Sequence, residues 1–343
     1  MYLLLVLASC ICTLNAFKSH HDNYELQTNE TDSDDDDDEY IDVDALNITN
    51  VEKGTKNTAD YKLYTKTQHG FISAYHDIPI NRDYQEKIFN MIVEIPKGTN
   101  AKMAISLGEA LNPIKHVLKN GNPEYVHVPN LLPNINHTGY IWNYGALPNT
   151  WENPTEIDNH TGLFGDGERM DVVEIGNRKA RRGEIIQLKA LGAIGLIVNG
   201  KIDYKIIAID VKNPKAAKMH DIWCVDEYFP DRMNATAEWF KHYYGLDGTP
   251  NNTLAFGGEW RHREFAHDVI TKSMFKWILL SINQVPNPGI SLFNTISGEE
   301  RNHGKIKFNE AEDIVERGKF PPGPIQFGIP FKPNVNNSHR GIH

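Results

Sequence analysis

The most constraining feature of this chain is one long, mostly apolar segment that ends in a two-residue turn signal. Residues 185–198 read IIQLKALGAIGLIV and run directly into Asn199-Gly200. Asn-Gly between two apolar runs is typical of a tight β-hairpin, because both turn positions require positive φ. The sequence therefore predicts a strand over 185–198, with Tyr204–Val211 as its partner strand.

The rest of the chain adds further strands and only a few helices. From residue 60, short β-type runs are divided by Pro, Gly and Asn, and Ile88–Glu94 alternates as a strand before Pro96. Helical spacing appears later, over 235–244 with Asn234 as its cap, and over 265–278. These patterns predict a β-barrel with helices packed outside it.

The N-terminus predicts export. Residues 1–16 combine a short apolar run at 3–7 with a small residue, Ala16, which is typical of a secretory signal peptide. The alternative, a membrane anchor, needs more than this run to span ~30 Å of hydrocarbon, and no later segment could span it. We expect a secreted glycoprotein, because the chain carries Asn-x-Ser/Thr sequons at Asn29, Asn47, Asn136, Asn159, Asn234, Asn251 and Asn336.

The three cysteines add a constraint on stability. Cys10 and Cys12 lie in the predicted signal peptide, which leaves Cys224 alone in the mature chain. An intramolecular disulfide is therefore excluded, and the domain must be stabilised by its own core.

Charge is concentrated in a predicted disordered arm over 17–50. Residues 17–45 hold twelve acids against Lys18 alone, whereas the whole chain has a net charge of −10, so the remainder lies near +1. A near-neutral body argues against nucleic-acid binding, which needs a basic surface. Three interpretations of residues 34–42 stay open: a solvated tail, loose Ca²⁺ binding, or an acidic setting for sulfation of Tyr40.

Several familiar motifs are absent. The sequence contains neither a Walker-type phosphate loop nor a Gly-x-Ser-x-Gly nucleophile elbow. His262 and His267 are five residues apart, which misaligns them on a helix and argues against a zinc pair. The basic run 178–182 is interpreted as a loop between strands, with a processing site as the alternative.

One acidic stretch has the composition of a metal site. Asp166, Glu168 and Asp171 fall within six residues after a glycine, and Asp203 follows the predicted hairpin. Carboxylate oxygens are the ligands that Mg²⁺ prefers, so these groups could converge on one cation. A solvated acidic turn is the alternative for this stretch taken alone.

Longer motifs surround this stretch in a fixed order. They read SAYHDIP at 73–79, FNMIVEIP at 89–96, TNAK at 99–102, GYIWNYGA at 139–146, TWE at 150–152, VEIG at 173–176, KALG at 189–192, DYKIIAID at 203–210 and EWF at 238–240. In these motifs the chain resembles the soluble family I inorganic pyrophosphatases of the eukaryotic type. The resemblance implies an OB-like five-stranded β-barrel with flanking α-helices over 51–290, followed by a C-terminal tail, 291–343, partly packed on it.

The resemblance also implies a reaction and the residues that perform it. The family hydrolyses pyrophosphate with several Mg²⁺ ions, and its eukaryotic members are often homodimers. Asp166, Asp171 and Asp203 would be metal ligands, supported by Glu94, with Glu168 at the position that orients the attacking water. The groups that would contact phosphate are Lys102, Tyr144, Lys205 and Tyr243, with Tyr140 nearby, and Lys102 and Tyr144 would also act in catalysis.

Six positions depart from the family pattern. Glu168 stands for an aspartate and Arg169 for a proline, Ala104 and Val198 stand for acids, Glu124 falls in the region of an expected arginine, and Tyr244 replaces a lysine. Misplacing a catalytic group by ~1 Å can cost ~10²-fold in rate. Two functions therefore stay open: a Mg²⁺-dependent diphosphatase of reduced activity, or a catalytically degenerate relative that binds metal or phosphate or acts through its acidic arm.

Overall fold

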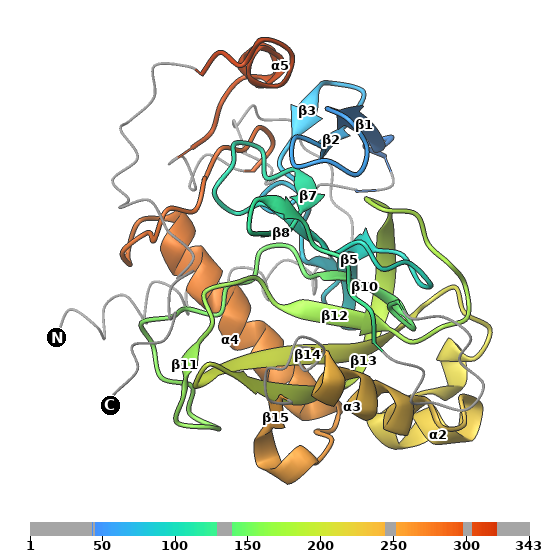
Figure 1. Ribbon diagram of the computed structural model, residues 1–343. Helices are drawn as coiled ribbons and strands as arrows, with labels where there is room; N and C mark the ends of the chain where they lie inside the picture. The colour runs from blue at the N-terminus through green and yellow to red at the C-terminus, as the bar shows by residue number, and fades with distance from the viewer. Residues whose placement is uncertain (1–42, 44, 129–138, 244–251, 298–303, 321–343) are drawn as a thin grey trace, which may run out of the picture. The chain divides into compact units, whose positions relative to one another are not determined.

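Five strands pair into a closed ring in the computed structural model, which describes residues 43, 45–128, 139–243, 252–297 and 304–320. Around the ring, each strand pairs with the next and the last pairs with the first: β5 (Ile88–Ile95), β10 (Asn143–Ala146), β12 (Asp171–Glu174), β14 (Lys201–Asp210) and β13 (Ile185–Val198). The β12–β14 pair is parallel and the other four are antiparallel. The expected five-stranded barrel is confirmed (Figure 1).

The predicted hairpin forms the longest part of this barrel. Val198 pairs with Lys201 across Asn199 and Gly200, whose φ angles of 52° and 75° fit a type I′ turn. The partner strand β14 begins at Lys201, three residues before the predicted start. A register shift between Ala190 and Gly192 bends β13, which pairs with β5 through its first residues and with β14 along most of its length.

A second sheet lies beside the barrel. It is built from β1 (Thr49–Lys53), β2 (Lys62–Lys66), β3 (Phe71–Ile72), β6 (Met103–Ile105) and β7 (Ile114–His116). The remaining strands are short: β4 (Asn81–Asp83), β8 (Leu118–Lys119), β9 (Asn122–Pro123), β11 (Phe164–Gly165) and β15 (Thr253–Leu254).

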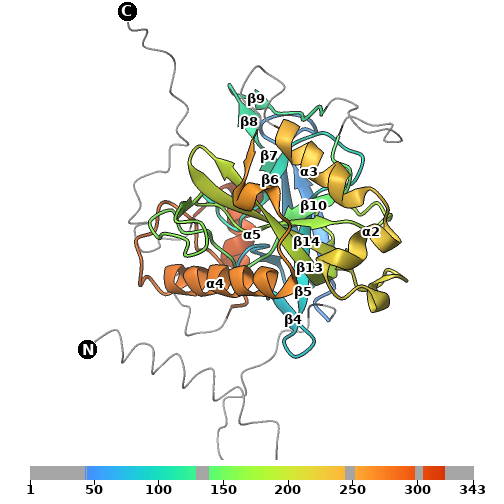
Figure 2. The same ribbon diagram turned by 90° about the horizontal axis from the view of Figure 1, so that it is seen from below.

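Two helices cover different sides of the barrel because neighbouring residues of each strand point to opposite faces. Val172 and Ile206 pack in a core cluster with Val269 of α4 (Arg263–Ser281). Val173 and Ile207 pack in another cluster with α3 (Arg232–His242). Figure 2 shows the two helices on different sides of the strands. The other helical elements are α2 (Val225–Tyr228), α5 (Phe308–Arg317) and short 3₁₀ turns at Ala216–Lys218, Ile222–Cys224 and Ala255–Gly258.

One helix prediction needs correction, and one helix was not predicted. The helix predicted to begin after Asn234 begins at Arg232, with Asp231 in the cap position, so Asn234 lies inside its first turn with an exposed side chain. Helix α5 was not predicted at all. Its apolar residues Phe308, Ala311 and Ile314 face the second sheet, but the face is only three turns long.

Part of the C-terminal region packs on the domain. The buried carboxylate of Asp77 accepts hydrogen bonds from the backbone N–H groups of Thr295, Ile296 and Ser297. Helix α5 adds an ion pair between Lys53 and Glu316.

Several predictions fall outside the described residues. They are the signal peptide, residues 17–42 of the acidic arm, the tail after 320 and the sequons at Asn29, Asn136, Asn251 and Asn336.

Candidate active site

The acidic stretch and the hairpin meet at one end of the parallel pair of strands. β12 begins with Asp171, which pairs with Lys205 of β14, and Asp203 lies two residues earlier on the same face of β14. Tyr144 of β10 donates a hydrogen bond to Oδ2 of Asp171. Residues predicted from separate motifs are therefore brought together by strand register.

Three carboxylates form a compact triad here: Glu152, Asp166 and Asp203. One oxygen from each lies within 4.8 Å of the corresponding oxygens of the other two. Glu152 is only 5% exposed, and its Oε1 accepts a hydrogen bond from the backbone N–H of Tyr204 at 3.2 Å. Its buried Oε2 has no hydrogen-bond partner among the described residues. A buried carboxylate oxygen without a donor is costly unless a cation faces it.

The pKa values of the triad point the same way. Burial raises the pKa of Glu152 and of Asp166 well above the usual range, and the neighbouring carboxylates raise both further. Burial also raises the pKa of Asp203, to about 6, against the opposing effect of Lys205. Three desolvated carboxylates this close together repel one another. A divalent cation would offset both the cost of burying their charges and their mutual repulsion. The all-oxygen donor set therefore fits Mg²⁺.

Lys205 lies between two of the predicted metal ligands. Its Nζ is 2.5 Å from Oδ2 of Asp171 and 2.5 Å from Oδ1 of Asp203, and its side chain is 5% exposed. Burial opposes the ammonium charge, but the two aspartates outweigh it and raise the pKa of Lys205 well above its usual value. Burial likewise opposes ionisation of Asp171, yet Lys205 and Arg169 prevail and lower its pKa.

Arg169 holds the two remaining predicted carboxylates. Its guanidinium donates to both oxygens of Glu94 and, through Nη1, to Glu168 at 2.8 Å. Glu94, on β5, is fully buried, whereas the side chain of Glu168 is 46% exposed. The structure thus places Glu94 against an arginine of the same chain.

A cation and two tyrosines form the other side of the site. The ammonium of Lys102 lies 5.4 Å from the centre of the Tyr243 ring, and Tyr243 Oη is 3.0 Å from Tyr140 Oη. The Tyr140 ring is 5.3 Å from that of Tyr144, which reaches Asp171. Burial raises the pKa of Tyr243 and of Tyr144, so both stay protonated donors. These contacts connect Lys102 to the carboxylates.

Comparison with known proteins decides the family. The family model described as inorganic pyrophosphatase matches residues 91–278. The inorganic pyrophosphatase of Drosophila melanogaster is 47% identical over 266 residues, which cover 77% of each chain. That of Zygosaccharomyces bailii is 44% identical over 277 residues, covering 80% of this chain and 94% of that protein. The chain belongs to the inorganic pyrophosphatase family.

Solved structures of pyrophosphatases share the fold. The Schistosoma japonicum inorganic pyrophosphatase superposes with a TM-score of 0.70 at 43% identity, covering 74% of this chain and 88% of that one. A truncated Trypanosoma cruzi vacuolar soluble pyrophosphatase, solved in complex with PPi, gives 0.63 at 30% identity and covers 78% of this chain and all of that one. The family has an OB-like barrel, in agreement with the closed ring of five strands.

The departures from the pyrophosphatase pattern can now be located. Glu124 pairs with Lys102, Nζ to Oε2, at 3.1 Å. Ala104 lies on β6 and Val198 ends β13, so neither position supplies a carboxylate. Tyr244 lies outside the described residues.

Glu152 is the site residue that the sequence analysis missed. It belongs to the TWE motif at 150–152, which contributed to the resemblance but received no role. The sequence did offer a signal for Glu152. This acid directly follows Trp151 in a motif shared with a family of enzymes that bind metal and phosphate, and the structure shows that Trp151 is buried.

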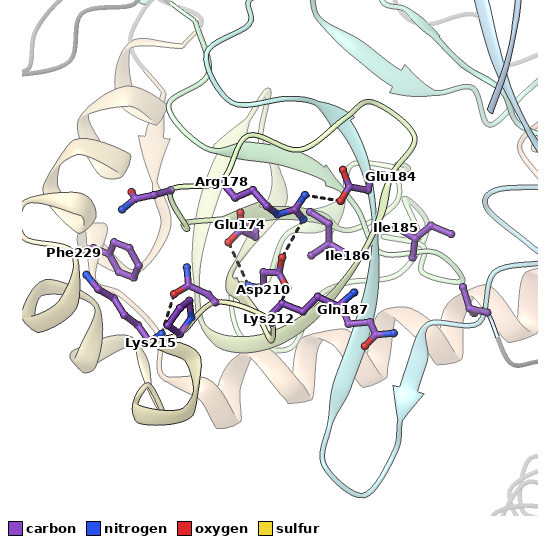
Figure 3. A pocket seen from close by; sticks show the side chains of 14 residues that line it. Glu174, Arg178, Glu184, Ile185, Ile186, Gln187, Asp210, Lys212, Lys215 and Phe229 are labelled. Carbon is purple, nitrogen blue, oxygen red and sulfur yellow. Dashed lines mark hydrogen bonds and ion pairs between the residues drawn. The ribbon is translucent and has the colours of Figure 1, made fainter. Parts of the chain in front are cut away.

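A separate cavity of about 650 Å³ lies at the opposite end of β12 and β14, beside Glu174 and Asp210. Figure 3 shows Arg178 there between Glu184 and Asp210, to which it is paired at 2.6 and 3.0 Å. This cavity contains none of the predicted site residues.

None of the helices in the described ranges combines the length and apolar character needed to cross a membrane.

Proposed function

We propose that this pyrophosphatase-family chain hydrolyses inorganic pyrophosphate to two phosphates, with Mg²⁺ bound by Glu152, Asp166 and Asp203. The observation that carries the proposal is the unpaired, buried Oε2 of Glu152 within a triad of carboxylates whose pKa values burial raises. The pyrophosphatase names of the relatives and the PPi complex of the T. cruzi protein support the substrate.

The chain's own residues divide the work between two sides. When bound, Mg²⁺ would neutralise phosphoryl oxygens and make a bound water acidic enough to attack. Lys205 contacts Asp171 and Asp203 at 2.5 Å and favours the ionised form of each. Lys102 and the hydroxyls of Tyr140 and Tyr243 would donate to the phosphate groups on the other side.

Reduced activity is part of the proposal. Glu124 pairs with Lys102 at 3.1 Å, so this carboxylate competes with phosphate for the lysine. Arg169 binds Glu168 at 2.8 Å, which restrains the group at the water-orienting position. The same two contacts favour the second candidate, a catalytically degenerate protein that binds metal or phosphate or acts through its acidic arm.

Phosphate release from pyrophosphate separates the two candidates. The purified protein with Mg²⁺ is compared with Asp166→Asn and with the wild type in EDTA. Release that disappears in both controls supports the enzyme. Equal, background release in all three samples contradicts it and leaves a binding protein.

We propose further that the protein is exported and glycosylated. The apolar segment at 3–7 supports export, and the side chains of Asn47, Asn159 and Asn234 are exposed. Secreted material from a eukaryotic host should lose mass on treatment with an N-glycosidase. Recovery only from the cell lysate, with no mass change, contradicts this part.

We propose that the domain at 51–290 forms a homodimer, with the tail at 291–343 partly packed on it. The support is the family resemblance and the hydrogen bonds from Thr295–Ser297 to Asp77. Light scattering should give twice the mass of one chain. A mass of one chain at micromolar concentration contradicts the dimer.

A further inference from the structure

Arg169 is a buried cation fixed by the chain inside a group of carboxylates. Its Nε and Nη2 each donate to an oxygen of Glu94 at 3.0 Å, while Nη1 donates to Glu168. Its Nη2 also lies 3.8 Å from Oδ1 of Asp171, and its side chain is 7% exposed. A two-pronged guanidinium–carboxylate pair is strong and fixed in geometry, unlike the contact of a flexible lysine.

Both oxygens of Glu94 accept hydrogen bonds in this arrangement. Oε1 accepts from Arg169 and from the backbone N–H of Ile105 at 2.7 Å, and Oε2 accepts from Arg169. The side chain has no exposure to solvent. A metal ion at Glu94 would compete with this pair, and loss of the pair would leave the guanidinium buried without its partner, a strongly destabilising state.

In contrast to Glu94, the triad of Glu152, Asp166 and Asp203 is not fully neutralised by cations of the described chain. No side-chain ion pair within the described residues reaches Glu152 or Asp166, and Oε2 of Glu152 has no hydrogen-bond donor. Lys205 contacts Asp203 but divides its charge between Asp203 and Asp171. The site is thus divided into one half that the chain neutralises itself and one half that still needs a cation.

We infer that Arg169 takes the place of a divalent cation between Glu94 and Glu168, so that the substrate-free protein binds one divalent ion per chain, at Glu152, Asp166 and Asp203. This inference rests on the proposed function, since it requires the triad to be the metal site. A guanidinium balances charge but offers no coordination position for water or phosphate. Arg169 is therefore a positioning residue, and water activation is confined to the triad.

Mn²⁺ binding tests the inference without relying on activity, because Mn²⁺ shares the preference of Mg²⁺ for octahedral oxygen sites. Free Mn²⁺ is titrated by electron paramagnetic resonance, without substrate, for the wild type, Arg169→Met, Arg169→Lys and Asp203→Asn. We expect one tightly bound ion in the wild type and in Arg169→Lys, which keeps the positive charge. Arg169→Met should bind two, and Asp203→Asn should lose the single ion.

The melting temperature provides a second readout for Arg169→Met. Without metal this variant should melt below the wild type, because Glu94 loses its counter-ion. Saturating Mn²⁺ should raise its melting temperature by more than it raises that of the wild type, since the second ion restores the lost charge. An equal rise in both proteins overturns the inference.

The wild type alone decides the question if Arg169→Met fails to fold. An isolated six-line spectrum at saturation supports one ion per chain, whereas a spin-coupled pair of ions in the wild type overturns the inference and leaves the proposed metal-dependent function intact. Binding of no ion at all contradicts the metal site of the proposed function and the inference together. An identical single ion in wild type and folded Arg169→Met overturns the inference alone.

Discussion

At the scale of residues, each cation of the site lies against a carboxylate of the same chain. Lys205 contacts Asp203, Arg169 contacts Glu94, and Lys102 contacts Glu124 at 3.1 Å. The first two pairs are almost completely buried, while the side chains of Lys102 and Glu124 are 18% and 24% exposed. Of these three cations, Lys102 is therefore the one most accessible to an anionic substrate that competes with its carboxylate partner.

Replacing Glu124 should accordingly improve the enzyme. Glu124→Gln removes the competing charge at Lys102 and should raise kcat/KM for pyrophosphate by about five-fold, mainly through a lower KM, since a partly exposed ion pair contributes ~1 kcal/mol. The control is Glu109→Gln, which breaks the ion pairs of Glu109 with Lys62 and Lys115 and leaves the pair of Lys102 with Glu124 in place. Steady-state kinetics that are unchanged in Glu124→Gln, or equally changed in Glu109→Gln, would refute this account of Lys102.

The residue scale also shows what could be predicted from the sequence. Asp166 and Asp203 lie together in the triad, whereas Asp171, at the start of the neighbouring strand, is linked to Asp203 through Lys205. The contact of Arg169 with Glu94 joins positions 75 residues apart, on elements whose register no local pattern gives. Glu152 was missed for a similar reason, since its partners become visible only when the loop at 150–170 has folded against β14.

At the scale of elements, the strongest local signals gave the most accurate predictions. The apolar run at 185–198 and the Asn199-Gly200 turn identified β13 and its hairpin, because the turn type needs positive φ at both positions. Closure of the ring was not predictable from residue patterns alone, since it depends on pairing of β13 with β5 far along the chain. Helix α5 was missed because so short an amphipathic helix depends on tertiary packing.

Within β13, Gly192 is the glycine that leaves the least space for a side chain. A Cβ atom there would lie 2.3 Å from the backbone oxygen of Arg261, at the bridge between Ala193 and Arg261. Gly192→Ala should therefore lower the free energy of unfolding by about 1–3 kcal/mol. In the control Gly108→Ala, the nearest atom is 3.6 Å away and the expected change is within ~0.5 kcal/mol. Urea denaturation measures both, and equal stability of the two variants would contradict the close approach.

At the scale of the whole molecule, one buried carboxylate joins the two ends of the described domain. Asp77 follows β3 near the N-terminus, and it accepts hydrogen bonds from Ser73, from three consecutive backbone N–H groups at 295–297 and from the hydroxyl of Ser297. It is 1% exposed. Because these donors reach both side-chain oxygens, both oxygens must be hydrogen-bond acceptors. An ionised carboxylate meets this requirement.

Asp77→Asn should destabilise the entire fold. The amide keeps the shape but turns one acceptor into a donor that faces N–H groups, so the free energy of unfolding should fall by about 2–3 kcal/mol. Asp83→Asn is the control, because Asp83 is exposed at the end of β4 and accepts a hydrogen bond from the backbone N–H of Glu86, and its expected change is within ~0.5 kcal/mol. Thermal unfolding monitored by circular dichroism compares them. A melting temperature of Asp77→Asn equal to that of the wild type would show that the 295–297 segment is not held through this carboxylate.

The kcat of Glu152→Gln at saturating Mg²⁺ is the decisive measurement for the proposal that Glu152 completes a metal triad for pyrophosphate hydrolysis. We expect kcat to fall by roughly 10²–10³-fold, because the variant keeps the shape of the side chain but removes a charged group from the reacting centre. Glu156→Gln, an exposed neighbour 3.7 Å from Lys276, should keep wild-type kcat. Wild-type turnover in Glu152→Gln, with the fold intact, would contradict the claim.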